Sequence, residues 1–234
     1  MARDAELFTG EVQVPRVEVR SLAEWRRFPV TALPGLAMGQ RWRGGAGEVR
    51  GTVRLGWGEE RLWVYARLPD ADIFNPVRAF NEPAFLQGDV FEMFLQGGLD
   101  AERYVEFHVS PENQRFQLVF LRGGDPGGGS AYVQGDYVGE LCRVPLNSGV
   151  RVDAAGGVWE VWAGVPFAVI GGEVAQLRGS FCRYDATRRE DGSLQRELFS
   201  TSPHLEARFH RRQEWARLCP GEALPVLDQA QGGS

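Results

Sequence analysis

The sequence predicts an all-β protein, an antiparallel β-sandwich of jelly-roll type with one or two short helices. Three observations favour this class: many apolar runs have strand length, turn residues separate them, and almost no long helical periodicity interrupts them. At 234 residues and 43% hydrophobic content, the chain can bury one large core. We expect a single domain over residues 1–228 and a disordered tail over residues 229–234.

The N-terminal half contains the first strands and one short helix. Ser21 and Glu24 form a capping-box pattern, which predicts a helix that carries Trp25. A turn at residues 58–60 separates two apolar runs and predicts a hairpin, and a second turn-rich segment separates the two central strands. The expected strands of this half span residues 12–19, 53–57, 61–68, 89–96 and 104–110.

The C-terminal half continues the strand pattern to the end of the predicted domain. A proline at position 166 leads into a short helix or turn around residues 168–171. The expected strands of this half span residues 114–122, 158–167, 180–186, 197–201 and 215–218, with further strand structure within residues 132–146.

Composition excludes several function classes. The formal net charge is −5 and the basic residues are scattered, which argues against nucleic acid or an anionic membrane as a partner. All 26 basic residues are arginine, so lysine Schiff-base and P-loop chemistry are excluded. No apolar run approaches the roughly 20 residues that span a bilayer, and the first ten residues lack the apolar segment of a signal peptide. We therefore expect a cytoplasmic protein as numbered, or an extracellular or periplasmic one if a leader was removed.

On each of three predicted strands, period-two alternation places polar residues on one face of the strand. Glu92 lies opposite the apolar residues of its strand, and His108 does so on the next strand, so the two share a face if the strands pair as a hairpin. Arg183 and Asp185 alternate with Cys182 and Tyr184 on a later strand. These segments offer a carboxylate, an imidazole and a guanidinium. The alternative is that they are solvated residues, or an ion pair, on a one-sided sheet.

The order of segments resembles a family 9 carbohydrate-binding module, especially its stand-alone bacterial forms. The resemblance runs from about Gly51 to Leu218 and rests on several modest motifs, of which the D-x-x-E of Asp89 and Glu92 and the closing FHRRQEW are the most specific. The other segments that carry it are LGWGEERLWVYARLPD, YVEFHVSPENQ, WEVWAGVPF and LRGSFCRYD. It implies a β-sandwich that binds a saccharide, often a chain end, between two aromatic side chains, without cleaving it. Such modules often accompany catalytic domains in secreted polysaccharide-degrading enzymes.

The resemblance also implies a binding site. The carboxylate that accepts hydrogen bonds from sugar hydroxyls falls on Glu92, and the polar positions of the two later strands fall on His108 and Arg183. The aromatic clamp, which is two tryptophans in the best-known members, falls here on Phe85 or Leu86 and on Phe209. Phenylalanine offers less area than tryptophan and no N–H donor.

Other features border this site or suggest a metal. His204 and His210 lie in the segment that borders the family's site, and we include His210 among the expected ligand-binding residues. Because some family members hold calcium, Asp70 and Asp72 leave a structural Ca²⁺ open, although such a site needs six or more converging oxygens. We otherwise expect no metal, no cofactor and no catalytic residue.

Three functions besides sugar binding stay open. Glu92 and Glu106 could serve as the acid and base of a glycoside hydrolase. Met93 or Met38 could ligate a haem together with His108, although Met93 alternates to the opposite face. Finally, a sandwich that has lost sugar binding could serve in assembly or as a spacer.

Overall fold

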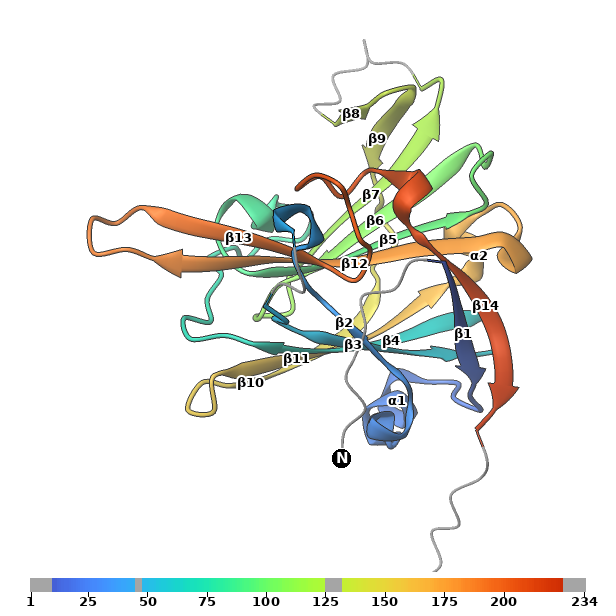
Figure 1. Cartoon of the computed structure of the whole chain (residues 1–234), viewed down its shortest axis with the longest axis horizontal. Helices are drawn as coiled ribbons and strands as arrows, with labels where there is room; N and C mark the ends of the chain where they lie inside the picture. The colour runs from blue at the N-terminus through green and yellow to red at the C-terminus, as the bar shows by residue number, and fades with distance from the viewer. Residues whose placement is uncertain (1–9, 45–47, 125–131, 225–234) are drawn as a thin grey trace, which may run out of the picture.

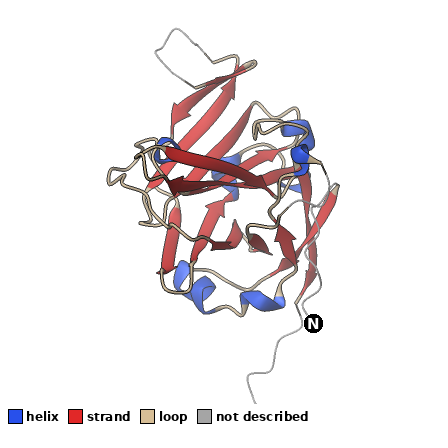
Figure 2. Ribbon diagram, turned by 60° about the vertical axis from the view of Figure 1, so that its left-hand side comes forward, coloured by secondary structure: helices blue, strands red, loops and turns tan. Residues whose placement is uncertain are grey.

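The computed structural model describes residues 10–44, 48–124 and 132–224, and these form two β-layers packed face to face (Figure 1). The predicted all-β sandwich is confirmed. The helices are short and lie at the periphery of the strand layers (Figure 2). The predicted tail at residues 229–234 and the domain end at residue 228 lie outside the described residues. No helix in the described ranges is long and apolar enough to cross a membrane.

The lower layer in Figure 1 is antiparallel and is built around the predicted hairpin. Its strands, in spatial order, are β10 (Asn147–Asp153), β11 (Val158–Pro166), β4 (Arg61–Pro69), β3 (Thr52–Trp57) and the short β2 (Gly35–Ala37). Strands β2 and β10 were not predicted, because β2 has three residues and most of β10 is polar and exposed.

The upper layer carries the two central strands predicted from the sequence. Its strands are β12 (Leu177–Arg188), β5 (Val90–Gly97), β6 (Arg103–Val109), β7 (Arg115–Arg122), β9 (Tyr137–Leu141) and β8 (Val133–Gln134), with β13 (Leu194–Ser200) paired to the other edge of β12. Strands β1 (Glu11–Arg16) and β14 (Ala216–Ala223) join the two layers. Strand β1 runs parallel to β14 and to β3, so the sheet is mixed at this junction, while the other strand pairs are antiparallel as expected.

The predicted capping box begins the first helix, α1 (Leu22–Arg27). Ser21 Oγ accepts a hydrogen bond from the Glu24 N–H at 3.2 Å, and the Glu24 carboxylate accepts one from the Arg20 N–H at 2.8 Å. The helix thereby brings Trp25 onto the outer face of the lower layer, where its indole N–H donates to the Val64 carbonyl. The second helix, α2 (Phe167–Ile170), follows Pro166 as predicted.

Two apolar clusters sandwich the upper layer. The main core lies between the layers and takes Phe91, Met93 and Leu95 from β5. A second cluster covers the outer face of the same strands and includes Phe94, Phe209 and the outward-facing aromatic side chains of β6 and β7. The outer face is therefore not the solvated face of a one-sided sheet, and polar residues on it lie beneath aromatic side chains.

Candidate functional site

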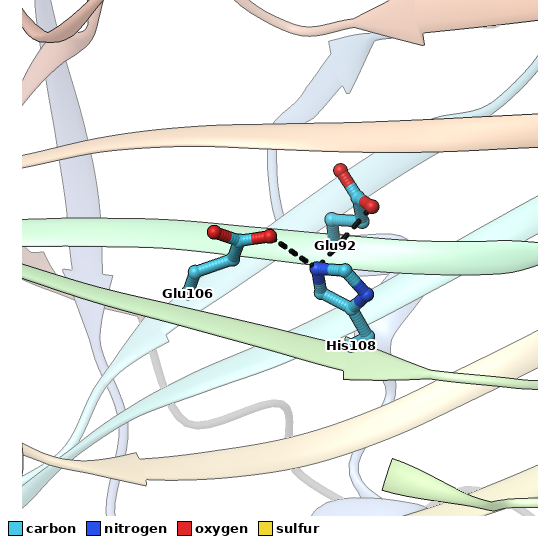
Figure 3. A group of neighbouring side chains, drawn as sticks. All are labelled: Glu92, Glu106 and His108. Carbon is cyan, nitrogen blue, oxygen red and sulfur yellow. Dashed lines mark hydrogen bonds and ion pairs between the residues drawn. The ribbon is translucent and has the colours of Figure 1, made fainter. Parts of the chain in front are cut away.

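The register of β5 and β6 brings three titratable side chains together on this outer face. Glu92 lies directly opposite His108, and Glu106 lies two residues before His108 on the same strand. The imidazole Nε2 of His108 is 2.7 Å from Glu106 Oε1 and 3.3 Å from Glu92 Oε1, so both carboxyl groups approach the same nitrogen (Figure 3). We call Glu92, Glu106 and His108 the cavity cluster. The predicted pairing of Glu92 with His108 is therefore present.

The cavity cluster is almost completely shielded from solvent. Glu92 is 2% exposed and His108 is 1% exposed, which corrects the expectation of an open, solvated face. Burial raises the pKa of Glu92 to about 8, since desolvation penalises the ionised carboxyl group. Burial opposes charge on Glu106 and His108 too. The hydrogen bond and attraction to His108 nevertheless lower the pKa of Glu106, while attraction to Glu92, together with the hydrogen bond to Glu106, raises the pKa of His108. The cluster thus consists of an ion pair and a carboxyl group that retains its proton near neutral pH.

A second histidine extends the cluster toward the C-terminal segment. His210 Nε2 is 3.6 Å from Glu106 Oε2, and its Nδ1 is 3.0 Å from the hydroxyl oxygen of Tyr104. Burial lowers the pKa of His210, which favours its neutral form. No hydrogen-bond donor among the described residues reaches Glu106 Oε2, although that atom is buried. A buried acceptor without a donor is costly, so this atom is placed to receive one from a ligand.

A cavity of about 250 Å³ opens directly above these side chains. Glu92, Glu106 and His210 line it, so the cavity reaches two members of the cavity cluster. Its walls are largely aromatic. The rings that line it are Phe85, Phe94, Phe120, Tyr132, Tyr184 and Phe209. The two phenylalanines expected to form the clamp, Phe85 and Phe209, therefore both face the same cavity as Glu92.

The aromatic walls come from segments far apart in the sequence. Phe85, in a short 3-10 turn before β5, has its ring edge against His108 at a centroid distance of 5.5 Å. Tyr184 of β12 contacts both Phe85 and Phe209, with its ring perpendicular to that of Phe209. Sequence analysis missed Tyr184, although its alternation with Arg183 was noted. Strand pairing is what places it here, since Cys182 of the same face lies opposite Glu92.

Arg183 lies on the other face of the sheet, which corrects the expectation that it joins Glu92 and His108. It is paired with Phe91, a residue of the main core, and its side chain is completely buried. Its guanidinium donates to Asp70 Oδ2 at 2.6 Å and to the backbone carbonyls of Arg50 and Pro69. Alternation identified two faces of β12 correctly, but it did not tell which of them faces the core.

Arg183 stands among three aspartates, which we call the arginine cluster. Asp70, Asp89 and Asp185 offer carboxylate oxygens within 4.8 Å of one another, a spacing that a cation could bridge. However, Arg183 lies 2.6 Å from Asp70 and 3.3 Å from Asp185, and both Asp89 oxygens accept backbone N–H groups. Asp72, the other residue considered for calcium, pairs with the exposed Arg188 instead. The residues present do not fit a Ca²⁺ site, because a guanidinium already supplies the positive charge.

The cavity cluster also has the residue types of a metal site, with two carboxylates and one imidazole within 4.8 Å. A histidine that holds a metal almost always donates its other ring N–H to a partner. His108 Nδ1 is buried and has no hydrogen-bond partner among the described residues. Its Nε2 is already engaged by Glu106, so this geometry supports an ion pair.

The geometry also bears on haem binding and on glycoside hydrolysis. Met93 and Met38 both lie in the main core, on the opposite side of the upper layer from His108, so the haem-ligand hypothesis is wrong. Glu92 and Glu106 approach one imidazole nitrogen between them. In a glycoside hydrolase, two carboxyl groups flank the scissile bond. Here the imidazole occupies the position between them.

Comparison with solved structures identifies this arrangement of strands. A putative carbohydrate-binding protein from Bacteroides uniformis aligns with a TM-score of 0.63 at 13% identity, over 90% of this chain and 99% of that one. A family 9 carbohydrate-binding module from Caldicellulosiruptor kristjanssonii, solved with glucose, aligns with a TM-score of 0.51 at 11% identity, over 90% and 96%. The chain has the fold of the family 9 carbohydrate-binding modules.

The same module solved with cellotriose aligns over 96% of this chain and 97% of that one, with a TM-score of 0.52 at 11% identity. The resemblance inferred from the sequence is therefore confirmed at the level of the fold. No family model and no curated protein sequence matches the chain. Since the identities are this low, the residues that line the cavity must carry any argument about the ligand.

Proposed function

We propose that this protein binds a saccharide, without cleaving it, in the cavity above Glu92. The observation that carries the proposal is the cavity itself, which combines aromatic walls with two carboxyl groups at its floor. Aromatic faces cover the apolar C–H surface of a sugar ring, while a few polar groups orient its hydroxyls. The solved neighbours with this fold include a module described in complex with glucose and with cellotriose.

The size of the cavity favours a single sugar unit. Pockets for drug-sized ligands typically measure about 300–1,000 Å³, and this one measures about 250 Å³. An internal segment of a polysaccharide would need an open groove on both sides of the bound ring. We therefore propose that the ligand is a monosaccharide or the terminal unit of a chain.

Glu92 is the residue proposed to select hydroxyl groups. Its ion-pair contact with His108 Nε2 is 3.3 Å long, whereas Glu106 takes the shorter contact with the same nitrogen. A protonated Glu92 can donate to one sugar oxygen and accept from the next. Phe85 and Phe209 would then cover the sugar ring, and the edge of the His210 imidazole would contact the sugar at the wall of the cavity.

The test is a calorimetric titration of the purified protein with monosaccharides and short oligosaccharides, alongside Glu92→Gln. A matched control is Glu160→Gln, because Glu160 is also a buried carboxylate but lies on β11 and is hydrogen-bonded by Tyr65. We expect binding by the parent and by Glu160→Gln, and at least tenfold weaker binding by Glu92→Gln. Cleavage of a bound oligosaccharide would contradict the non-catalytic part of the proposal. Absence of binding to every saccharide would instead favour the assembly or spacer role.

A further inference from the structure

The cavity cluster holds more carboxyl groups than cationic groups. Glu92 and Glu106 share one imidazole, and Glu106 takes the shorter contact, 2.7 Å against 3.3 Å. Burial lowers the pKa of His210 and favours its neutral form, so His210 does not supply a full positive charge. One carboxyl group of the cluster therefore has no cation of its own, and it lies at the floor of the cavity.

Two carboxyl oxygens are available to a ligand here. Glu106 Oε2 is buried and accepts no hydrogen bond from the described residues, and Glu92 makes an ion-pair contact with His108 Nε2 at 3.3 Å. Both residues line the cavity and both are more than nine-tenths buried. Carboxylates accept strong, charge-assisted hydrogen bonds from ammonium groups, and such bonds gain strength where water is excluded. The floor of the cavity thus offers acceptors that a neutral hydroxyl would satisfy only weakly.

The walls of the cavity suit a positive charge as well. Six aromatic rings line it, and the face of an aromatic ring attracts a cation. The only basic side chain besides His210 that lines the cavity in the described part of the chain is Arg208. Arg208 is exposed and donates to Gln134, so its charge lies at the rim, where water screens it.

From this geometry we infer that the preferred ligand is an amino sugar, whose protonated amine donates hydrogen bonds from the cavity side to carboxyl oxygens of Glu92 and Glu106. The inference rests on the proposed saccharide site and adds the chemical class of its ligand. The sugar ring would lie against Phe85, Tyr184 and Phe209, and the ammonium group would supply the cation that the second carboxyl group lacks.

Proton uptake by the free protein is consistent with this ligand. Burial raises the pKa of Glu92 to about 8, so a proton holds the place of the missing cation at neutral pH. An ammonium ligand would favour the ionised carboxylate and expel that proton on binding. The titratable or charged groups near Glu92 come from β6, β12, the residue before β8 and the C-terminal segment. They are Glu106, His108, Tyr132, Cys182, Tyr184, Arg208 and His210.

The experiment compares three sugars that share one ring: glucose, glucosamine and N-acetylglucosamine. Titrations at pH 6.5 in buffers with different ionisation enthalpies give both affinity and the number of protons released. We expect glucosamine to bind at least tenfold more tightly than the other two, with release of up to about one proton for each molecule bound. The Glu92→Gln variant should lose most of this preference, and Glu160→Gln should keep it.

The outcomes separate this inference from the proposed function. Equal or tighter binding of glucose would overturn the amino-sugar inference and leave saccharide binding intact. A preference for glucosamine that persists in Glu92→Gln would overturn the assignment to this carboxyl group. Failure of all three sugars and of longer saccharides would overturn the proposed function, and the inference with it.

Discussion

Two buried polar clusters lie on opposite faces of the upper layer, in the region of β5, β6 and β12. The cavity cluster is on the outer face, where His108 lies opposite Glu92 of β5. The arginine cluster is on the face toward the core, where Arg183 lies opposite Phe91, the residue before Glu92. Both contain several carboxyl groups and one basic side chain. They differ in how the carboxyl oxygens are satisfied, and this difference separates a candidate binding site from a structural element.

In the arginine cluster nearly every carboxyl oxygen has a donor. Asp89 accepts the N–H groups of Phe74 and Ala186, and Asp70 accepts those of Asp72 and Arg183. These bonds tie β4 to β12 across the two layers. In the cavity cluster, no donor from the described part of the chain reaches Glu106 Oε2, and a cavity adjoins this atom. Saturated hydrogen bonding indicates a role in stability, while an unmet acceptor beside a cavity indicates recognition.

The largest expected effect is on the free energy of unfolding, and it tests whether the arginine cluster stabilises the fold. Replacing Arg183 with Met removes the cation from a buried cluster and leaves the Asp70 carboxylate unpaired, which costs about 3–5 kcal/mol. The control is Arg188→Met, since Arg188 is exposed and solvent screens its pair with Asp72, so its loss should change the free energy of unfolding far less. Urea unfolding measures both. Equal stability of the two variants would mean that Arg183 does not support the fold.

The second effect concerns pH and the cavity cluster. The folded pKa of Glu92, about 8, lies above the ordinary value of 4.5. Between these values the folded state binds a proton that the unfolded state lacks, so stability falls as pH rises from about 4.5 to 8, by up to about 1.4 kcal/mol per pH unit. Glu92→Gln removes this contribution.

Urea unfolding of the parent and of Glu92→Gln at several pH values from 5 to 8 tests this sign. The variant should gain stability relative to the parent as pH rises, because glutamine cannot ionise. The raised pKa of His108 adds a decline of the same sign, and Glu92→Gln weakens this decline because attraction to Glu92 is the largest cause that raises that pKa. The difference between the two proteins therefore reports Glu92 together with its coupling to His108. A difference that does not change with pH would show that Glu92 ionises freely.

Local sequence signals predicted much of the fold. The capping box at Ser21 and Glu24 begins α1 as expected, and period-two alternation located β5 and β6. Strand β10 was not predicted, because most of it is exposed and it carries few apolar residues. Its sequence therefore has little periodic signal. The parallel pairing of β1 with β14 was not predicted, because the paired residues lie about 200 positions apart in the sequence and no local pattern connects them.

The site was predictable only in part for the same reason. Alternation and the resemblance together pointed to Glu92, His108, Phe85 and Phe209, which the structure places close together. They misplaced Arg183, since polar residues were assumed to face away from the core and Arg183 instead pairs with buried aspartates inside it. Tyr184 looked like a core residue by the same assumption. The pairing register between β12 and β5, which only tertiary structure defines, reverses both assignments.

A smaller effect tests whether the cavity walls contribute to binding. Phe85→Ala removes a half-buried ring that contacts His108 and Tyr184, and we expect about tenfold weaker saccharide binding, since an aromatic contact is worth roughly 0.5–1.5 kcal/mol beyond its buried area. Phe80→Ala is the matched control, because Phe80 is 39% exposed and does not line the cavity. Calorimetric titration compares the two variants. Equal affinities would remove Phe85 from the proposed site.

The smallest expected effect is that of calcium on the melting temperature, and it tests most directly whether the arginine cluster is a structural element. If Arg183 supplies the positive charge of the arginine cluster, calcium has no place there, and neither excess Ca²⁺ nor a chelator should change the melting temperature. A ligand present at 100 times its dissociation constant would stabilise the folded state by about 2.7 kcal/mol, which a thermal scan resolves easily. A calcium-dependent rise in the parent would make the arginine cluster a cation site. The same rise in Asp89→Asn would place the ion elsewhere, because Asp89 contributes to the only group of three aspartates this close among the described residues.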